Sequence, residues 1–289
     1  MQLRIIIFNI LIVFFLLLAV LFPISFFGRG MTQDYWRTVW PFLLAVLAAL
    51  GGMDFFFLLN RRFFTLLEKG DWPALAAYLK KEIYQDGKYT SRNVHFLAQS
   101  CLLLGDTGAV MELESKAAAR NPALVEKNAL LFGISRLMAA RGNENSGASG
   151  FFLSILEKKR KPAAGDPWLK WYYGFSLAIA RSFEQAGAVF GELAASSKNG
   201  SKDIVVSAVA SFFLSRVMGE HPAVTGELLA KAEAGKGRVR RTIKTPAGWQ
   251  KKTVKVKSEV HGAIIDRYLE EAGVWIFGGQ TEESNYETR

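Results

Sequence analysis

The residues with the clearest capacity for chemistry lie in one basic stretch. Residues 238–257, RVRRTIKTPAGWQKKTVKVK, contain eight Lys or Arg side chains and no acid. Guanidinium and ammonium groups bind phosphate and carboxylate oxygens through charge-assisted hydrogen bonds. The stretch therefore predicts a surface for an anionic partner. Its candidate residues are Arg238, Arg240, Arg241, Lys244, Trp249, Lys251, Lys252, Lys255 and Lys257.

Three interpretations of this stretch remain open. It could be a solvated loop, because runs of charge often do no more than keep a protein soluble. It could bind anionic lipid, since each basic residue near a negative leaflet contributes about 1 kcal/mol. It could bind RNA, with Trp249 stacking on a base, or an acidic protein. One aromatic residue among eight charges is a weak nucleic-acid signature, so lipid or an acidic protein is the favoured partner.

The sequence on either side of the basic stretch has a helical pattern. GELLAKAEAGKG ends one predicted helix, and SEVHGAIIDRYLEEAGVWIFGG begins another. Within residues 238–257, Thr, Val and Ile partly alternate with Lys and Arg on both sides of a Pro-Ala-Gly break. This alternation predicts a small two-stranded β-hairpin inserted in a helical domain.

The rest of the sequence contains no recognisable catalytic or metal-binding motif. There is no HExxH, CxxC, GxSxG or GxGxxG, and AEAGKGR lacks the residues that a phosphate-binding loop needs. His95, His221 and His261 are far apart in sequence, and Cys101, the only cysteine, lies in an apolar helical pattern. We therefore expect a protein without enzymatic activity, cofactor, metal or small-molecule substrate. A single cysteine also fits a reducing compartment.

Two apolar segments predict a transmembrane hairpin over residues 1–60. Residues 5–27 contain no charged side chain, and residues 39–59 contain only Asp54. A span needs about 20 apolar residues, so both are long enough. A cleaved signal peptide is the alternative for the first segment, but its apolar run is too long and ends in FFGRG, without a small-residue cleavage site.

The charges flanking these segments predict their orientation. Arg4 precedes the first span, and Arg61 and Arg62 follow the second, whereas the connecting loop holds two Arg and one Asp. The positive-inside rule then places both termini, and the domain that follows, in the cytoplasm of a bacterial inner membrane protein. Asn9 and Asp54 would lie at similar depths and form a polar pair across the hairpin.

Residues 61–277 show an internal recurrence that predicts stacked helical hairpins. Gly70, Gly105 and Gly142 mark turns 35 and 37 residues apart. Small residues at corresponding positions would let neighbouring helices approach closely, and Gly174 is followed after twelve and sixteen residues by Ala186 and Phe190. This spacing resembles the tetratricopeptide repeat, a helix–turn–helix unit of 34 residues. The predicted packing residues are Ala98, Gly133, Gly174, Ala186, Phe190 and Ala208.

The overall layout of two spans, Arg61-Arg62 and helical repeats resembles that of HemY-type bacterial membrane proteins. No haem role follows from this architectural resemblance. The fold class expected is all-α, with a flexible tail over residues 278–289. The expected function is a membrane-anchored scaffold that binds protein partners on the cytoplasmic side. The net charge of +10 keeps open the alternative of a membrane tether for nucleic acid or anionic lipid.

Overall fold

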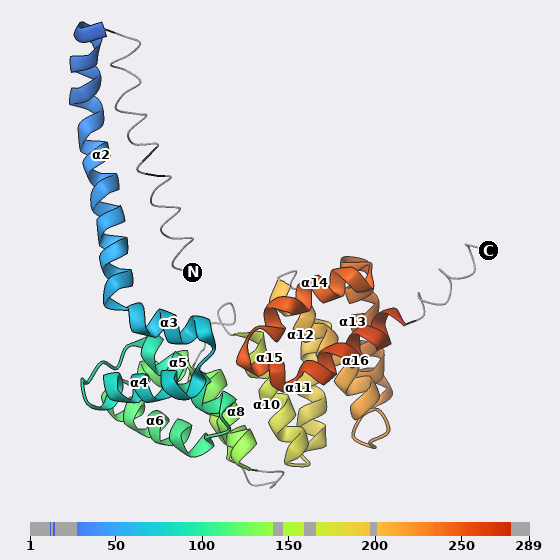
Figure 1. The fold of residues 1–289 in the computed structure, drawn as a ribbon. Helices are drawn as coiled ribbons and strands as arrows, with labels where there is room; N and C mark the ends of the chain where they lie inside the picture. Colours follow the sequence, from blue (N-terminus) through green and yellow to red (C-terminus); the bar gives the residue numbers. More distant parts are fainter. Residues whose placement is uncertain are drawn as a thin grey trace. The chain divides into compact units, whose positions relative to one another are not determined.

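The computed structural model describes residues 12, 14, 28–140, 147–158, 166–196 and 201–278. The secondary structure of these residues is helical, without a strand (Figure 1). The predicted all-α fold class is therefore confirmed. The chain divides into two compact units, Met1–Tyr78 and Leu79–Arg289. The predicted tail, residues 278–289, lies outside the described residues apart from Gly278.

The first unit contains a long apolar helix. α2 spans Gly28–Leu59, and within it the 20 residues Trp40–Leu59 have a mean hydropathy of 2.3 and bury no side chain. At 1.5 Å per residue this segment is about 30 Å long, which matches the hydrocarbon thickness of a bilayer. It is thus long and apolar enough to cross a membrane. α3 (Arg61–Lys69) follows, and the rings of Phe57 and Phe64 lie 5.0 Å apart across the junction.

The two-span hairpin is only partly represented in the described residues. The predicted second span, 39–59, coincides with the apolar part of α2. Apart from residues 12 and 14, the predicted first span, 5–27, lies outside the described residues. Asn9 lies outside them as well, and so does its predicted pairing with Asp54.

The second unit is built from successive helices that pack against their neighbours along the chain. α4 (Trp72–Tyr84) runs through the boundary between the two units. The helices that follow are α5 (Ser91–Leu103), α6 (Thr107–Arg120), α7 (Pro122–Lys127), α8 (Ala129–Ala139), α9 (Ala148–Lys158), α10 (Pro167–Ile179), α11 (Phe183–Ala195), α12 (Ser201–Phe212), the π-helix η1 (Phe213–Val217), α13 (Gly226–Ile243), α14 (Pro246–Lys257), α15 (Val260–Ile264) and α16 (Asp266–Phe277).

Local sequence explains where these helices turn. Gly70 and Gly105 have φ angles of 65° and 72°, in the left-handed region that glycine enters without steric cost. Arg181 takes the same conformation, with φ of 57°, between α10 and α11. Thr90 and Asp106 then cap the following helices, accepting hydrogen bonds from Asn93 N (3.1 Å) and Ala109 N (3.0 Å).

An aromatic cluster forms the centre of the core. The fully buried Trp171 on α10 lies with its ring centroid 5.2 Å from that of Phe175, 6.0 Å from Phe190 and 5.9 Å from Phe213. Tyr268 of α16 joins the same cluster, 5.6 Å from Phe213. These contacts connect α10, α11, η1 and α16, so the last helix packs directly onto the body of the array.

The predicted repeat-packing residues all lie at buried helix contacts. A Cβ on Gly133 would stand 2.2 Å from Phe152 Cζ, and one on Gly174 would stand 3.1 Å from Phe190 Cε1. Ala98, Ala186 and Ala208 are fully buried, as is Phe190. Small side chains at these positions therefore set how closely α8 approaches α9 and α10 approaches α11.

The predicted β-hairpin is wrong. Residues 238–257 form the end of α13 and the whole of α14. Pro246 begins α14 at a position where proline is favoured, and the Thr245 side chain caps it by accepting a hydrogen bond from Gly248 N (3.1 Å). Trp249, Thr253 and Val256 are buried, and their spacing of four and three residues places them on one helical face.

Candidate interaction surface

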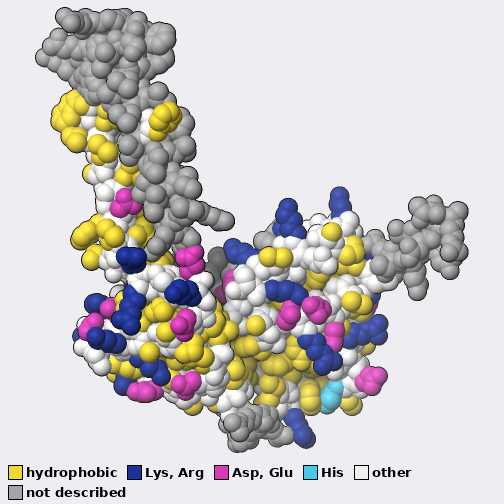
Figure 2. Space-filling model, viewed as in Figure 1, with side chains coloured by type: hydrophobic (Ala, Val, Ile, Leu, Met, Phe, Trp, Pro, Cys, Tyr) yellow, Lys and Arg dark blue, Asp and Glu magenta, His cyan; other side chains and the backbone are white. Residues whose placement is uncertain are grey.

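The basic stretch forms an exposed surface on α13 and α14. Figure 2 shows Lys and Arg side chains projecting over this part of the second unit. Seven of the predicted basic residues are exposed, and six of these make no ion pair within the described part of the chain. We call them the basic face: Arg240, Arg241, Lys244, Lys251, Lys252 and Lys255.

Two other predicted basic residues hold the helices together. The Arg238 guanidinium donates to the backbone oxygen of Ala194, which links α13 to α11. Lys257 Nζ lies 2.6 Å from Asp266 Oδ1 and 3.0 Å from Glu270 Oε1, which links α14 to α16. The hydrogen bond to Asp266 is the main cause that raises the pKa of Lys257. Both cations are therefore occupied by structural contacts.

Trp249 does not belong to the exposed surface. Its side chain is 5% exposed, and its indole Nε1 donates to the backbone oxygen of Leu269 (3.1 Å). Gly273 makes room for the indole, since a Cβ there would stand 2.6 Å from Trp249 Nε1. The predicted stacking of Trp249 on a base is wrong, because α16 covers the ring.

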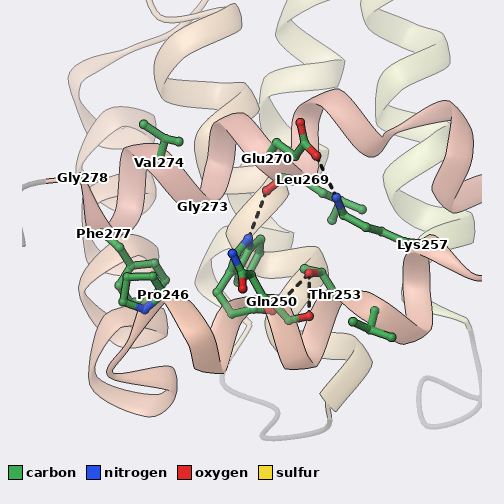
Figure 3. Close-up of a pocket in the computed structure, with 12 residues that line it drawn as sticks. Pro246, Gln250, Thr253, Lys257, Leu269, Glu270, Gly273, Val274, Phe277 and Gly278 are labelled. Carbon is green, nitrogen blue, oxygen red and sulfur yellow. Dashed lines mark hydrogen bonds and ion pairs between the residues drawn. The ribbon is translucent and has the colours of Figure 1, made fainter. Parts of the chain in front are cut away.

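An apolar groove with a volume of about 560 Å³ runs between α14 and α16 beside the basic face (Figure 3). Val254 and Val274 lie at the groove with exposed fractions of 64% and 72%. Thr253 Oγ1 donates to backbone oxygens of its own helix, so it adds little polarity. The lining residues are Pro246, Trp249, Gln250, Thr253, Val254, Lys257, Leu269, Glu270, Gly273, Val274, Phe277 and Gly278.

The sequence patterns did not identify this groove. Leu269, Gly273 and Phe277 recur every four residues, which predicts one helical face. That spacing is the signal by which the α16 side could have been found. The α14 side could not be found in this way, because the predicted β-hairpin at residues 238–257 does not have the helical spacing that brings Trp249 and Thr253 onto one face.

A second, more polar cavity of about 450 Å³ lies among α5, α7, α8 and α15. His95 Nδ1 is 3.1 Å from Asn128 Oδ1, and His261 Nδ1 is 3.4 Å from Glu259 Oε2. The Asp166 side chain at its edge accepts a hydrogen bond from Trp168 N (3.2 Å) and caps α10. No group of three or more His, Cys, Asp or Glu residues in the described chain is arranged to hold a metal ion.

The buried titratable groups of the second unit serve packing. Cys101 is 1% exposed, and burial raises the pKa of its thiol, so it lacks the features of a nucleophile. Arg136 Nη2 donates to both carboxylate oxygens of Glu114, at 2.8 and 3.0 Å. Burial also raises the pKa of Tyr172, whose hydroxyl donates to the backbone oxygen of His261 (3.1 Å).

These features define an all-helical protein that has a helix suited to crossing a membrane and, in its second unit, an apolar groove beside exposed cations. The chain belongs to the family described as "Uncharacterised Treponema protein", whose model matches residues 109–278. A protein of Treponema pallidum (strain Nichols), described as "Uncharacterized protein", is 27% identical over 256 residues, covering 86% of this chain and 79% of the relative. No solved structure matches the chain. The matched range includes the basic face and the groove.

Proposed function

We propose that this protein is a membrane-anchored adaptor that binds a protein partner through its helical domain. The observation that carries the proposal is the apolar groove between α14 and α16, with Val254 and Val274 at 64% and 72% exposure. A recessed apolar groove lined by a few polar side chains is the feature on which a binding-site hypothesis is ordinarily built. The surrounding cations give that site a preference for acidic partners.

The anchor in this proposal is the two-span hairpin predicted for residues 5–27 and 39–59. The exposed, apolar Trp40–Leu59 segment of α2 supports the second span. The uncharged run of residues 5–27 supports the first. Arg61 and Arg62, directly after the second span, favour a bacterial inner membrane protein whose termini and helical domain are cytoplasmic.

The binding domain in this proposal is a degenerate array of tetratricopeptide-like hairpins. The packing of α5 on α6, α8 on α9 and α10 on α11 supports it, as does the close contact of Gly174 with Phe190. Stacked hairpins bury a continuous core and leave extended surfaces for partners. Repeat arrays of this kind act through extended binding surfaces.

A two-part experiment tests this function. The full chain, tagged at its C-terminus, is expressed in the cells that make it, and their membranes are washed with alkaline carbonate. The proposal predicts that the chain stays with the membranes, and that a mild-detergent pull-down enriches at least one protein over a tag-only control. Release by carbonate would contradict the anchor. A pull-down without any enriched protein would contradict the adaptor function.

A second candidate function is a tether for anionic lipid or nucleic acid, which the six exposed cations of the basic face favour. Its test is the dependence of binding on salt. The logarithm of the affinity for duplex DNA falls with the logarithm of salt concentration with a slope of about −0.9 per phosphate contact. Six contacts would therefore give a slope of about −5. Association that is nearly independent of salt would contradict this candidate.

A further inference from the structure

Resting on the proposed function, we propose that the groove between α14 and α16 binds an acidic, amphipathic helix of a partner protein. The apolar side chains of that helix occupy the groove, and its carboxylates contact Lys251 and Lys255. This is the helix-in-groove mode of recognition, in which residues spaced three and four apart supply the anchors.

The groove has a buried apolar floor and a more exposed apolar border. Trp249, Leu269 and Phe277 line it and are 5%, 0% and 3% exposed, so its floor is recessed. Val254 and Val274 are far more exposed and stand at its border. The volume of about 560 Å³ lies within the range of pockets that bind ligands. A side chain inserted from a helix reaches such a floor, whereas the flat surface of a bilayer does not.

The helical geometry of α14 places exposed lysines next to the groove. Gln250 and Val254 line the groove, and Lys251 and Lys255 each follow one of them by a single residue. One residue corresponds to about 100° around a helix, so these cations lie along the flank of α14 next to the groove. Lys252 lies about 200° around the helix from Gln250, on the side of α14 away from the groove.

The acidic residues of α16 do not neutralise this flank. Glu270 is held by Lys257 at 3.0 Å, and Glu271 is held by Arg267 at 2.7 Å. Lys251 and Lys255 make no ion pair with any described residue. They outnumber the one carboxylate left in excess where Asp266 and Glu270 share Lys257, so the net charge beside the groove is positive. Positive charge beside an apolar groove is complementary to a helix with carboxylates beside an apolar stripe.

The same contacts disfavour nucleic acid at this site. Binding of single-stranded nucleic acid relies on aromatic rings on which bases stack. Trp249 is buried and donates its indole N–H to Leu269 O. The ring is thus committed to the α14–α16 contact, and none of the exposed residues that line the groove is aromatic.

A site-specific crosslink identifies the occupant directly. The photoreactive amino acid p-benzoylphenylalanine replaces Gln250, which is exposed and lines the groove, in the full chain held in lipid nanodiscs. The nanodiscs are incubated with an extract of the cells that make the protein and irradiated, and mass spectrometry maps the adduct. The proposal predicts an adduct on a protein segment with Glu or Asp beside apolar residues at helical spacing. An adduct only on lipid, RNA or another copy of this chain overturns it.

Charge reversal tests the basic flank with a matched control. K251E/K255E reverses the two cations beside the groove, and like charges facing each other should lower the yield of the protein adduct at least about tenfold. K81E/R120E makes the same change in net charge at two exposed sites on other helices, and its yield should stay at the unreversed level. Equal yields from the two variants, each with an unchanged far-ultraviolet circular dichroism spectrum, contradict the proposal.

The outcomes separate this inference from the function on which it rests. If the pull-down enriches a protein but the crosslinker at Gln250 produces no adduct with it, the groove proposal fails and the adaptor function stands. If the pull-down enriches no protein, the adaptor function itself fails.

Discussion

The contact between Gly133 and Phe152 offers a quantitative test of how the helical array packs. Gly133 lies inside α8, and a Cβ added there would meet the fully buried Phe152 ring of α9 at 2.2 and 2.3 Å. Real Cβ atoms do not approach so closely, so Gly133→Ala must displace the ring or separate the two helices. Tyr172 stacks on Phe152 with centroids 6.3 Å apart, which limits the ring's movement.

A matched substitution isolates the cost of this clash. Gly150 lies in α9, is exposed, and has nothing within 4 Å of an added Cβ. Alanine is favoured over glycine by about 1 kcal/mol inside a helix, and this gain applies to both sites. Overpacking of a core costs about 1–3 kcal/mol. Gly133→Ala should therefore be less stable than Gly150→Ala by about 1–3 kcal/mol.

Thermal unfolding of the full chain in mild detergent, followed by near-ultraviolet circular dichroism, measures this difference. At about 2–4 °C per kcal/mol, the melting temperature of Gly133→Ala should lie about 2–12 °C below that of Gly150→Ala. Adding Phe152→Leu should cost less in the Gly133→Ala background than in the wild-type chain, because the smaller side chain relieves the clash. Equal melting temperatures for the two alanine variants would refute the close approach of α8 and α9.

Three further predictions concern other contacts of the second unit. Gly273→Ala places a Cβ 2.6 Å from Trp249 Nε1 and should therefore destabilise the chain by about 1–3 kcal/mol. It should also change the near-ultraviolet circular dichroism signal of tryptophan, and an unaltered signal would contradict the contact. Cys101 is buried and its pKa is raised, so at a given pH its thiolate fraction is lower in the folded chain than in the unfolded chain. Iodoacetamide should therefore label Cys101 at least about tenfold faster in urea than in the folded chain. Lys257 is half-exposed, so its ion pairs should add less than about 1 kcal/mol to the free energy of unfolding. Because its pKa is raised in the folded state, this stabilisation should be complete below the unfolded pKa near 10.4. It should be lost as the pH rises through the folded pKa. Urea unfolding of wild type and Lys257→Met should thus differ at pH 7, and the difference should shrink as the pH is raised through the folded pKa of Lys257. A difference that stayed constant while Lys257 lost its proton would contradict this role.

The helical array was predictable because its signals are local. The left-handed turns at Gly70 and Gly105 follow from the freedom of glycine, and the apolar periodicity of the segments between them specifies helices. The turn between α10 and α11 adopts the same conformation with an arginine, Arg181, at φ of 57°, so no glycine marks it. The gap of 77 residues from Gly142 to Gly219 is close to two repeat steps and predicts a turn near Arg181, where the structure has it.

The basic stretch misled sequence reasoning for a physical reason. Its Thr and Val residues favour strands, and Pro-Ala-Gly is typical of a turn. In the structure the proline starts a helix, and packing decides the rest, since Trp249, Thr253 and Val256 form one buried face against α16 and its neighbours. Tertiary packing thus outweighed the intrinsic preference of β-branched residues.

The groove could not be predicted because it depends on two helices whose contact the sequence does not specify. The spacing of Leu269, Gly273 and Phe277 indicates an apolar face, but gives no partner for it. Val254 and Val274 line one groove only because the fold packs α14 against α16.

The measurement that tests the central claim most directly compares partner recovery by three full-length chains in mild detergent. The first is the wild type, the second is V254D/V274D at the groove, and the third is L153D/V217D, which places the same charges at exposed apolar sites elsewhere. The adaptor account predicts that the enriched protein is lost from the groove variant and kept by the control, with both variants folded. Full recovery by the groove variant would contradict it.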